Sequence, residues 1–134
     1  MSEIKRVAIV GAGYMGTQIG LQCAAHGFAT SIYDPVATAR EQAQQLIERE
    51  LDRRIAASES ETSERSATSA RLSYSDSLEK TTAAADLIIE AIPEQLELKR
   101  QLFTQLDALC PAEAIFATNS SSIKISNIES ATQR

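Results

Sequence analysis

The sequence has few residues of the kinds that build metal sites and disulfide scaffolds. Its 134 residues include one histidine, two cysteines and no tryptophan. Cys23 and Cys110 lie far apart and form no CxxC pair, so the sequence indicates neither a metal site nor a disulfide scaffold, and we expect reduced cysteines. The single histidine, His26, precedes Gly27 at the end of a helical pattern, and this position favours a capping role over catalysis.

Long apolar runs and an excess of positive charge are also missing. No run approaches the roughly 18 apolar residues of a membrane span, and the N-terminal residues lack the pattern of a signal peptide. The formal net charge is −5 at pH 7. We therefore expect neither a membrane nor a nucleic acid as a partner, and a cytoplasmic location. A chain of this length can bury one core, so residues 1–134 are expected to form a single domain.

All five glycines lie between residues 11 and 27, which indicates a special backbone requirement in this stretch. The apolar run 4–10 leads into GAGYMG at 11–16, a helical pattern follows, and an acid ends a second apolar segment. Strand, glycine turn, helix, strand and acid in this order form the fingerprint of dinucleotide binding. The expected cofactor-binding residues of this stretch are Gly11, Ala12, Gly13, Tyr14, Met15, Gly16 and Asp34.

The positions of this fingerprint have separate physical roles. Gly11 permits the tight turn, Gly13 leaves space for a pyrophosphate, and Gly16 lets the helix lie close to the sheet. The phosphates would bind backbone N–H groups at the positive end of the helix dipole. Asp34 would accept hydrogen bonds from the adenosine ribose and repel a 2′-phosphate, so we expect NAD rather than NADP.

Strands and helices alternate along the whole chain. Apolar patterns predict strands and helices over these residues: strands 4–10, 28–33, 70–74, 86–92 and 114–118, and helices 14–26, 36–55, 77–85 and 95–109. Pro35 fits the first turn of the second helix, and residues 121–134 fit a short helix. The polar residues 56–77 form either a helical arm or a loop. The alternation predicts an α/β protein with a Rossmann-type, doubly wound parallel sheet in the order 3-2-1-4-5.

Motifs in the second half carry a more specific resemblance. IEAIPE at 89–94, LKRQLF at 98–103 and TNSSS at 118–122 follow the glycine motif. With these motifs the chain resembles the N-terminal, NAD-binding domain of the L-3-hydroxyacyl-CoA dehydrogenases, including the 3-hydroxybutyryl-CoA dehydrogenases. The resemblance covers all but residues 56–77. It implies an oxidoreductase of fatty acid metabolism that interconverts L-3-hydroxyacyl-CoA and 3-ketoacyl-CoA by hydride transfer.

The resemblance also assigns roles to residues beyond the glycine motif. It implies that Glu94 and Lys99 line the nicotinamide-ribose side, and that Ser121 contacts both the cofactor and the substrate's 3-oxygen. Asn119 would lie beside Ser121 as the second catalytic residue. These residues follow the fourth and fifth strands, where ligands bind in open α/β sheets. From the residues alone, Glu94 also fits a helix start, and 119–122 also fits a helix cap.

Two features depart from the family in the substrate region. Ser120 stands where the family most often has threonine, and it keeps the hydroxyl. The family's CoA-contacting lysines lie in the stretch after the second strand, whereas residues 41–79 contain arginines and no lysine. We expect an acyl-thioester substrate with CoA as its carrier, and a different thioester carrier remains the alternative.

A third departure concerns the end of the chain. In the family, a sixth strand delivers the histidine that takes the hydroxyl proton, and an all-helical domain follows. The sequence has neither after Arg134, so we expect a Rossmann domain that lacks the C-terminal helical domain and has little activity alone. The alternative is a non-catalytic NAD-binding module that needs a partner chain. Apolar surface left open beside the fifth strand predicts a homo-oligomer, with a dimer as the working hypothesis.

Overall fold

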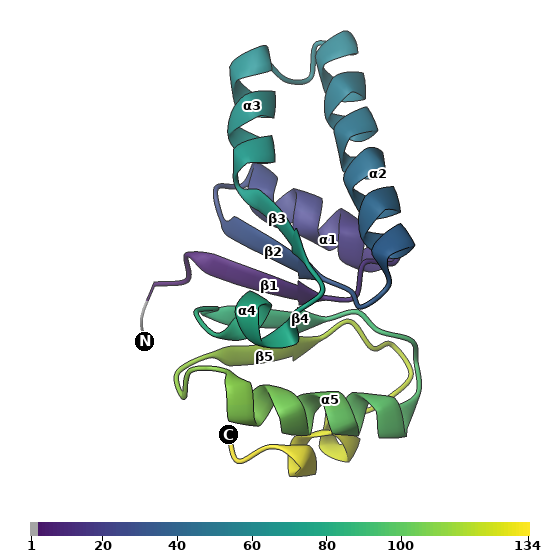
Figure 1. Cartoon of the computed structure of the whole chain (residues 1–134), viewed down its shortest axis with the longest axis vertical. Helices are drawn as coiled ribbons and strands as arrows, with labels where there is room; N and C mark the ends of the chain where they lie inside the picture. The colour runs from purple at the N-terminus through teal and green to yellow at the C-terminus, as the bar shows by residue number, and fades with distance from the viewer. Residues whose placement is uncertain (1–2) are drawn as a thin grey trace.

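The sheet is formed by five short strands whose neighbours are all parallel. The computed structural model describes residues 3–134 (Figure 1). Its strands are β1 (Arg6–Val10), β2 (Ala29–Tyr33), β3 (Leu72–Ser75), β4 (Leu87–Glu90) and β5 (Ile115–Thr118). They lie in the order β3-β2-β1-β4-β5, and each pair is parallel. The predicted doubly wound sheet is therefore confirmed.

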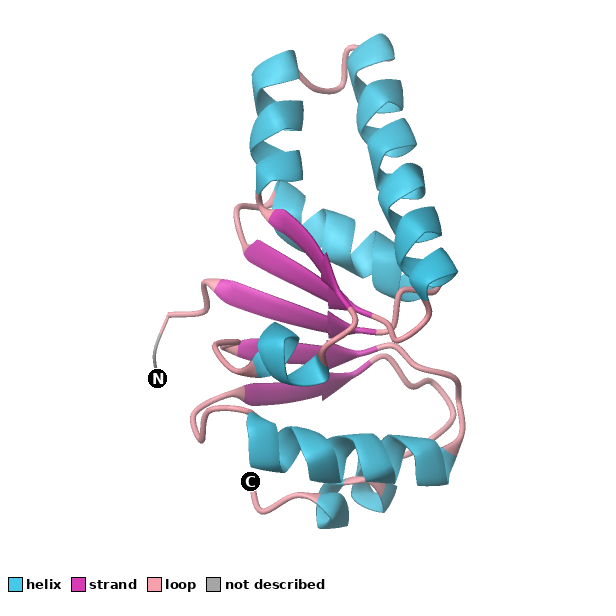
Figure 2. Ribbon diagram, in the orientation of Figure 1, coloured by secondary structure: helices cyan, strands magenta, loops and turns pink. Residues whose placement is uncertain are grey.

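Helices cover both faces of this sheet (Figure 2). The helical elements are α1 (Tyr14–Ala25), α2 (Ala37–Ala56), α3 (Thr62–Ala70), α4 (Leu78–Thr82), α5 (Leu96–Leu109) and the 3-10 turns η1 (Ile125–Asn127) and η2 (Glu129–Ala131). Side chains alternate along β1: Val7 and Ile9 pack with α1 and α2, whereas Ala8 and Val10 pack with α5 and η1–η2. The central strand is thus buried on both sides, which explains its nearly continuous apolar sequence.

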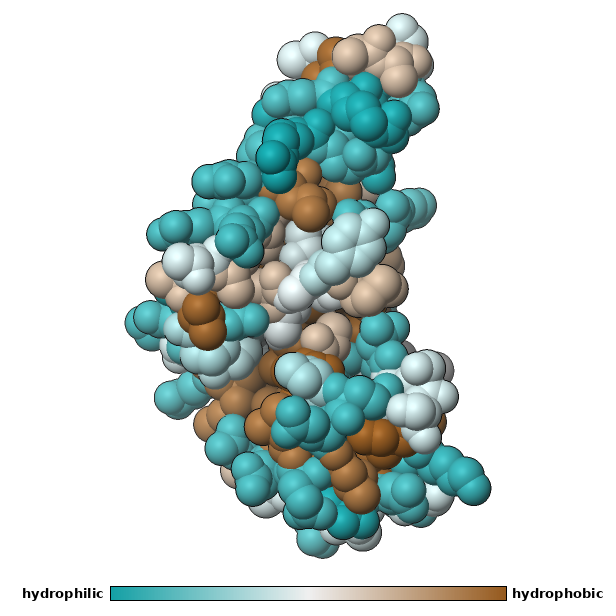
Figure 3. All heavy atoms as spheres, turned by 90° about the vertical axis from the view of Figure 1, so that its right-hand side faces the viewer, coloured by the Kyte–Doolittle hydropathy of each residue, from teal (hydrophilic) through white to brown (hydrophobic). Residues whose placement is uncertain are grey.

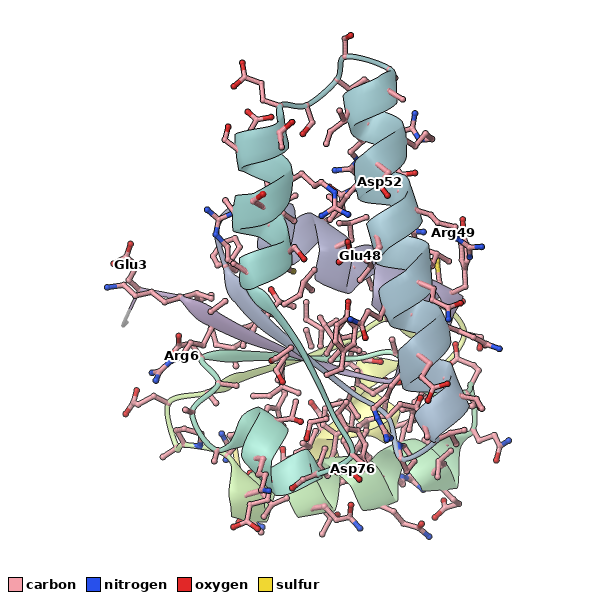
Figure 4. All side chains as sticks on the ribbon, turned by 45° about the horizontal axis from the view of Figure 1, so that its top comes forward. Glu3, Arg6, Glu48, Arg49, Asp52 and Asp76 are labelled. Carbon is pink, nitrogen blue, oxygen red and sulfur yellow. The ribbon has the colours of Figure 1, made fainter. Side chains whose placement is uncertain are left out.

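Part of the polar stretch 56–77 is helical and projects from the sheet as an arm, α2–α3 (Figure 1). The helix α3 begins with a reciprocal capping box between Glu61 and Glu64, which satisfies two backbone N–H groups. Glu48 and Asp52 lie on the side of α2 that faces α3, where both accept hydrogen bonds from Arg65 (Figure 4). Polar side chains therefore connect the two helices of the arm.

Two sequence predictions about helix ends were wrong. Pro35 lies before α2, because the Val36 N–H donates to the Asp34 carboxylate (2.9 Å) and the helix begins only at Ala37. Residues 121–134 do not form one helix but the two 3-10 turns, because Ile128 is buried against the core and interrupts them. No helix within residues 3–134 is long and apolar enough to cross a membrane.

Candidate functional site

Four turns that follow strands meet at the carboxyl edge of the sheet. They comprise residues 11–13 after β1, 34–36 after β2, 91–95 after β4 and 119–124 after β5. Backbone hydrogen bonds link these turns to the ends of neighbouring strands, among them Gly11 N–H to the Tyr33 carbonyl of β2 (2.8 Å) and Asn119 N–H to the Glu90 carbonyl of β4 (2.8 Å). Figure 3 looks onto this edge, where apolar side chains gather between more polar surfaces. The strand order reverses between β1 and β4, which is where open α/β sheets bind ligands.

The glycine turn separates residues that the fold requires from one that it does not. Gly11 has φ +115°, and a Cβ there would lie 2.6 Å from the Ala91 carbonyl oxygen. A Cβ on Gly16 would lie 1.9 Å from the Gly11 carbonyl oxygen. A Cβ on Gly13, in contrast, would meet no atom of residues 3–134 within 4 Å other than those of its immediate chain neighbours. The space over Gly13 is therefore open to a ligand, whereas Gly11 and Gly16 are required by the protein itself.

The contact that brings α1 close to the sheet is made by Gly20, which the sequence analysis did not single out. A Cβ on Gly20 would lie 2.7 Å from the Ile32 side chain of β2. Gly16 instead brings α1 against the turn that carries Gly11. The spacing of four residues between Gly16 and Gly20 puts both on one helix face, and this signal was available in the sequence.

The start of α1 fits an anion. Within residues 3–134 no side chain caps this helix at Gly13, and its first turn contains no acidic residue. The first N–H groups of the helix thus face outward at the positive end of the helix dipole. Tyr14 and Met15 are 71% and 50% exposed, so they offer apolar surface beside these N–H groups. The cradle fits the diphosphate of a dinucleotide.

Asp34 is held beside the glycine turn by both of its carboxylate oxygens. Oδ2 accepts from the Ala12 N–H (3.0 Å), and Oδ1 accepts from the Val36 N–H (2.9 Å). Arg40 donates to the Asp34 backbone carbonyl (2.6 Å), which fixes the turn from the other side. Each carboxylate oxygen keeps a further lone pair for a ribose hydroxyl.

Glu94 connects the turns after β4 and β5. Its carboxylate accepts from the Ser120 hydroxyl, from the Ser121 N–H (3.1 Å) and from Lys99 Nζ (3.0 Å). Hydrogen bonds from Ser120 and then from Lys99 lower its pKa from 4.5 to about 2. Glu94 is therefore ionised at neutral pH, and its charge holds the serine turn in place.

The serines of the turn after β5 differ in their hydrogen bonds. The Ser120 hydroxyl donates to Glu94 and accepts from the Ile123 N–H (3.1 Å), so it caps the following turn. The side chains of Asn119 and Ser121 are exposed and hydrogen-bond to no other group of residues 3–134. The sequence also allowed residues 119–122 to act as a helix cap, and in the structure only Ser120 has this capping role. The side chains of Asn119 and Ser121 stay available to a substrate.

Lys99 lies beneath the site rather than along it. Its side chain is only 2% exposed, and Nζ contacts both oxygens of Glu90 (2.9 and 3.0 Å) as well as Glu94. The Lys99 ammonium therefore meets two carboxylates and is shielded from solvent. Glu90, buried at 0% exposure, was missed from the sequence. A charged residue at the end of an otherwise apolar strand was the signal that could have identified it.

The single histidine lies at the opposite edge of the sheet. The helix α1 connects two parallel strands, so it runs back from the carboxyl edge and ends at the amino edge. There the His26 ring nitrogen Nδ1 hydrogen-bonds to the Gln22 carbonyl (2.8 Å), and Gly27 follows with φ +98°. The expected capping position is confirmed, and His26 does not belong to the site.

Comparisons with known proteins agree with this geometry. The family described as "3-hydroxyacyl-CoA dehydrogenase, NAD binding domain" matches residues 6–134. The probable 3-hydroxybutyryl-CoA dehydrogenase of Bacillus subtilis is 35% identical over 98% of this chain and 46% of its own length. The 3-hydroxyadipyl-CoA dehydrogenase of Escherichia coli is 39% identical over 96% of this chain and 27% of its own length.

A solved structure is similar over the whole chain. It belongs to a diketoreductase that acts on dicarbonyl compounds, with a TM-score of 0.90 and 38% sequence identity over 100% of this chain and 48% of that protein. This chain therefore spans less than half the length of each of these three proteins.

Proposed function

Because this chain belongs to the 3-hydroxyacyl-CoA dehydrogenase family and matches its NAD-binding domain, we propose that it is the cofactor half of an oxidoreductase acting on L-3-hydroxyacyl thioesters. The reaction interconverts the 3-hydroxyl and 3-keto forms. One observation carries the proposal: the turn with the exposed Asn119 and Ser121 is joined through Glu94 to the edge of the sheet that carries the dinucleotide cradle.

The residues of the site divide the reaction between them. NAD, when bound, supplies the hydride acceptor, or the hydride donor in the reverse direction. Asp34 binds the adenosine ribose, and the N–H groups at the start of α1 bind the diphosphate. The Ser121 hydroxyl hydrogen-bonds to the substrate's 3-oxygen, and Asn119 orients the substrate beside it. Glu94 keeps this turn in place and faces the nicotinamide ribose.

The residues of this site provide no suitable base to remove the hydroxyl proton. Hydride transfer from a hydroxyl needs a base within hydrogen-bond reach. Glu94 has a pKa of about 2 and is a weak base at neutral pH. His26 caps the far end of α1. We therefore expect these 134 residues to bind NAD and to turn substrate over slowly without a further base. The alternative, a non-catalytic module completed by a partner chain, rests on the same observation.

The proposed carrier of the acyl group is CoA, as in the names of the two curated relatives. A different carrier stays the alternative, because Arg53, Arg54 and Arg65 of the arm already bind carboxylates of the arm and are not free to bind CoA phosphates. The diketoreductase, a similar protein that acts on dicarbonyl compounds, supports the same alternative. Kinetics with matched CoA and N-acetylcysteamine thioesters would distinguish the two carriers.

The proposed function is tested with the 134-residue chain, NAD and 3-hydroxybutyryl-CoA, by following the absorbance of the reduced cofactor. Calorimetry should detect NAD binding, and absorbance should rise only slowly. Gly13→Ala should weaken NAD binding by at least about tenfold, since the added Cβ occupies the space of the diphosphate. Its extended backbone (φ −72°, ψ −175°) accepts alanine, so stability should change by no more than about 1 kcal/mol.

Two outcomes would contradict this proposal. Absence of NAD binding at millimolar concentration would refute the assignment of the site. Sustained and fast production of reduced cofactor by the chain alone, instead of a slow rise, would refute both the missing base and the non-catalytic module.

Self-association and location complete the proposal. A groove of about 320 Å³ lies between β5 and η1–η2, and its lining includes Ile115 and Ile125, which are 40% and 68% exposed. Apolar surface at the edge of a sheet favours association, so we propose a homodimer. Size-exclusion chromatography at two concentrations measures this state. A cytoplasmic location remains a prediction from the sequence.

A further inference from the structure

The most deeply buried carboxylate in the site region belongs to Glu90, the last residue of β4. Its side chain is 0% exposed, and each of its two carboxylate oxygens accepts hydrogen bonds. Oε1 accepts from the Ile92 N–H (2.8 Å) and Lys99 Nζ (2.9 Å), and Oε2 accepts from Lys99 Nζ (3.0 Å) and the Thr118 hydroxyl. A buried carboxylate is costly unless it is paired and hydrogen-bonded in this way.

Each partner of Glu90 leads on to a different part of the site. Lys99 Nζ also contacts Glu94 (3.0 Å), which follows β4. The Thr118 hydroxyl also accepts from the Ser120 N–H (3.1 Å), which belongs to the turn after β5. Glu90 and Thr118 are register partners in the sheet, so this bridge joins adjacent strand ends. A single side chain thus connects Glu90 to each of the two turns that follow β4 and β5: Lys99 to the first and Thr118 to the second.

The carboxylate also determines where β4 ends. Because the Ile92 N–H donates to the Glu90 side chain, the backbone leaves the sheet at this point and turns toward Glu94. A glutamine amide has one oxygen and one NH2 group in place of two carboxylate oxygens, so it would either leave the Ile92 N–H without an acceptor or replace the Thr118 hydrogen bond by one in which the amide donates. It would also remove the negative charge that faces Lys99. The loss of hydration on burial offsets much of the attraction within an ion pair of this kind, so the pair adds little net free energy to folding. Its main effect here is to fix the positions of the groups around it.

We propose that Glu90 is a positioning residue for the nicotinamide half of the site. It holds Lys99 and Thr118 in place, and through them Glu94 and the turn of Asn119 and Ser121. This role rests on the proposed function, in which Glu94 and that turn face the nicotinamide ribose and the substrate. The Asp34 carboxylate makes no hydrogen bond in this network, and Gly11 meets it only by packing on the Ala91 backbone. We therefore expect binding of the adenosine half to change little when Glu90 is altered.

The test compares two ligands on the same chain. NADH occupies both halves of the proposed site, whereas ADP occupies only the adenosine and diphosphate half. Glu90→Gln should lower the affinity for NADH about tenfold and change that for ADP less than about twofold, as expected when buried hydrogen bonds are lost on one side only. The emission spectrum of bound NADH should move toward that of free NADH, because the nicotinamide is no longer held.

Further variants keep the test informative where Glu90→Gln folds poorly. Thr118→Val removes the hydroxyl bridge and should lower the NADH-to-ADP affinity ratio in the same direction. Thr118→Ser keeps the hydroxyl and should restore it. Glu113→Gln removes an exposed carboxylate before β5, at the amino edge of the sheet, and is the matched control that should leave both affinities unchanged.

The outcomes separate this role from the proposed function. An equal loss of NADH and ADP affinity in Glu90→Gln and Thr118→Val, or no loss of either, would overturn the positioning role while the NAD site stands. A wild-type chain that binds ADP as tightly as NADH would have no nicotinamide-side site and would overturn it as well. A wild-type chain that binds neither ligand would refute the proposed function together with this role.

Discussion

The arm and the carboxyl edge of the sheet use the same kinds of ion pairs in opposite surroundings. On the arm, Arg53 binds Glu50 of its own helix and Arg65 binds Asp52 of the neighbouring helix α2, while 54% and 25% of the two arginine side chains stay exposed. At the carboxyl edge, Lys99 and Glu90 form their pair with 2% and 0% exposure. Water can replace the partners on the arm, whereas nothing replaces them at the edge.

This difference determines what each region tolerates. The ion pairs of the arm are weak and replaceable, so its charged residues should be open to change with little consequence for the sheet. The carboxyl edge depends on a few groups that must all be present, because each buried partner satisfies another. A substitution at the edge should therefore affect both folding and ligand binding, and a similar substitution on the arm should affect neither strongly.

The largest effect is expected from Lys99→Met. This substitution keeps the apolar stem but leaves the Glu90 carboxylate buried without its cation, which typically costs about 3–5 kcal/mol. Urea unfolding followed by circular dichroism measures the loss. The double variant Lys99→Met with Glu90→Gln removes the orphaned charge and should recover part of it. A loss below about 1 kcal/mol would mean that the pair is not the constraint inferred from its burial.

The same contrast explains what the sequence could predict. The strand order and the glycine turn followed from local patterns, because apolar periodicity and a run of glycines are properties of neighbouring residues. The cofactor assignment followed from the glycine turn and Asp34, and the family followed from the motifs carrying Glu94 and Ser121. These features need no knowledge of distant contacts, and the parallel sheet then brings the strand ends together.

The sequence could not reveal how the site is supported. The family resemblance assigned Lys99 to the nicotinamide-ribose side, and nothing in the local sequence indicates that its ammonium is buried, because lysine is almost never fully buried unless paired. Its burial depends on Glu90, nine residues earlier, and on Thr118 of another strand. Similarly, the polar composition of residues 56–77 left helix and loop undecided, since the capping box of α3 and the Arg65 contacts to α2 appear only in the folded chain.

Lowering the pH tests the contrast between the arm and the carboxyl edge, because one carboxylate in each region has a similarly lowered pKa. Glu94 at the edge and Glu50 on the arm both have a pKa of about 2, against an ordinary 4.5. The cause is hydrogen bonds from Ser120 and then Lys99 for Glu94, and from Arg53 and Arg54 for Glu50. A lowered folded-state pKa contributes stability above about pH 4.5 that is lost as the pH falls toward 2.

Variants at these two carboxylates should share the same direction of pH dependence in stability and should differ in binding. The difference in unfolding free energy between wild type and Glu94→Gln should shrink as the pH falls from about 5 to about 2.5, and likewise for Glu50→Gln. At neutral pH, only Glu94→Gln should lower NADH affinity, because only Glu94 lies in the site. Urea unfolding over this pH range and fluorescence titration with NADH measure both. A pH-independent difference for Glu94→Gln would contradict its lowered pKa.

The smallest effect is expected from Arg65→Met on the arm. Arg65 donates to Asp52 (2.7 Å) and Glu48 (2.6 Å) across the two helices, but all three groups can be hydrated when a partner is lost. The shift in the urea midpoint should be less than about a quarter of that of Lys99→Met, since methionine keeps the apolar stem in contact. Arg49→Met is the matched control, because Arg49 points away from α3 (Figure 4). A loss as large as that of Lys99→Met, or a drop in NADH affinity, would mean that the arm and the carboxyl edge are energetically coupled.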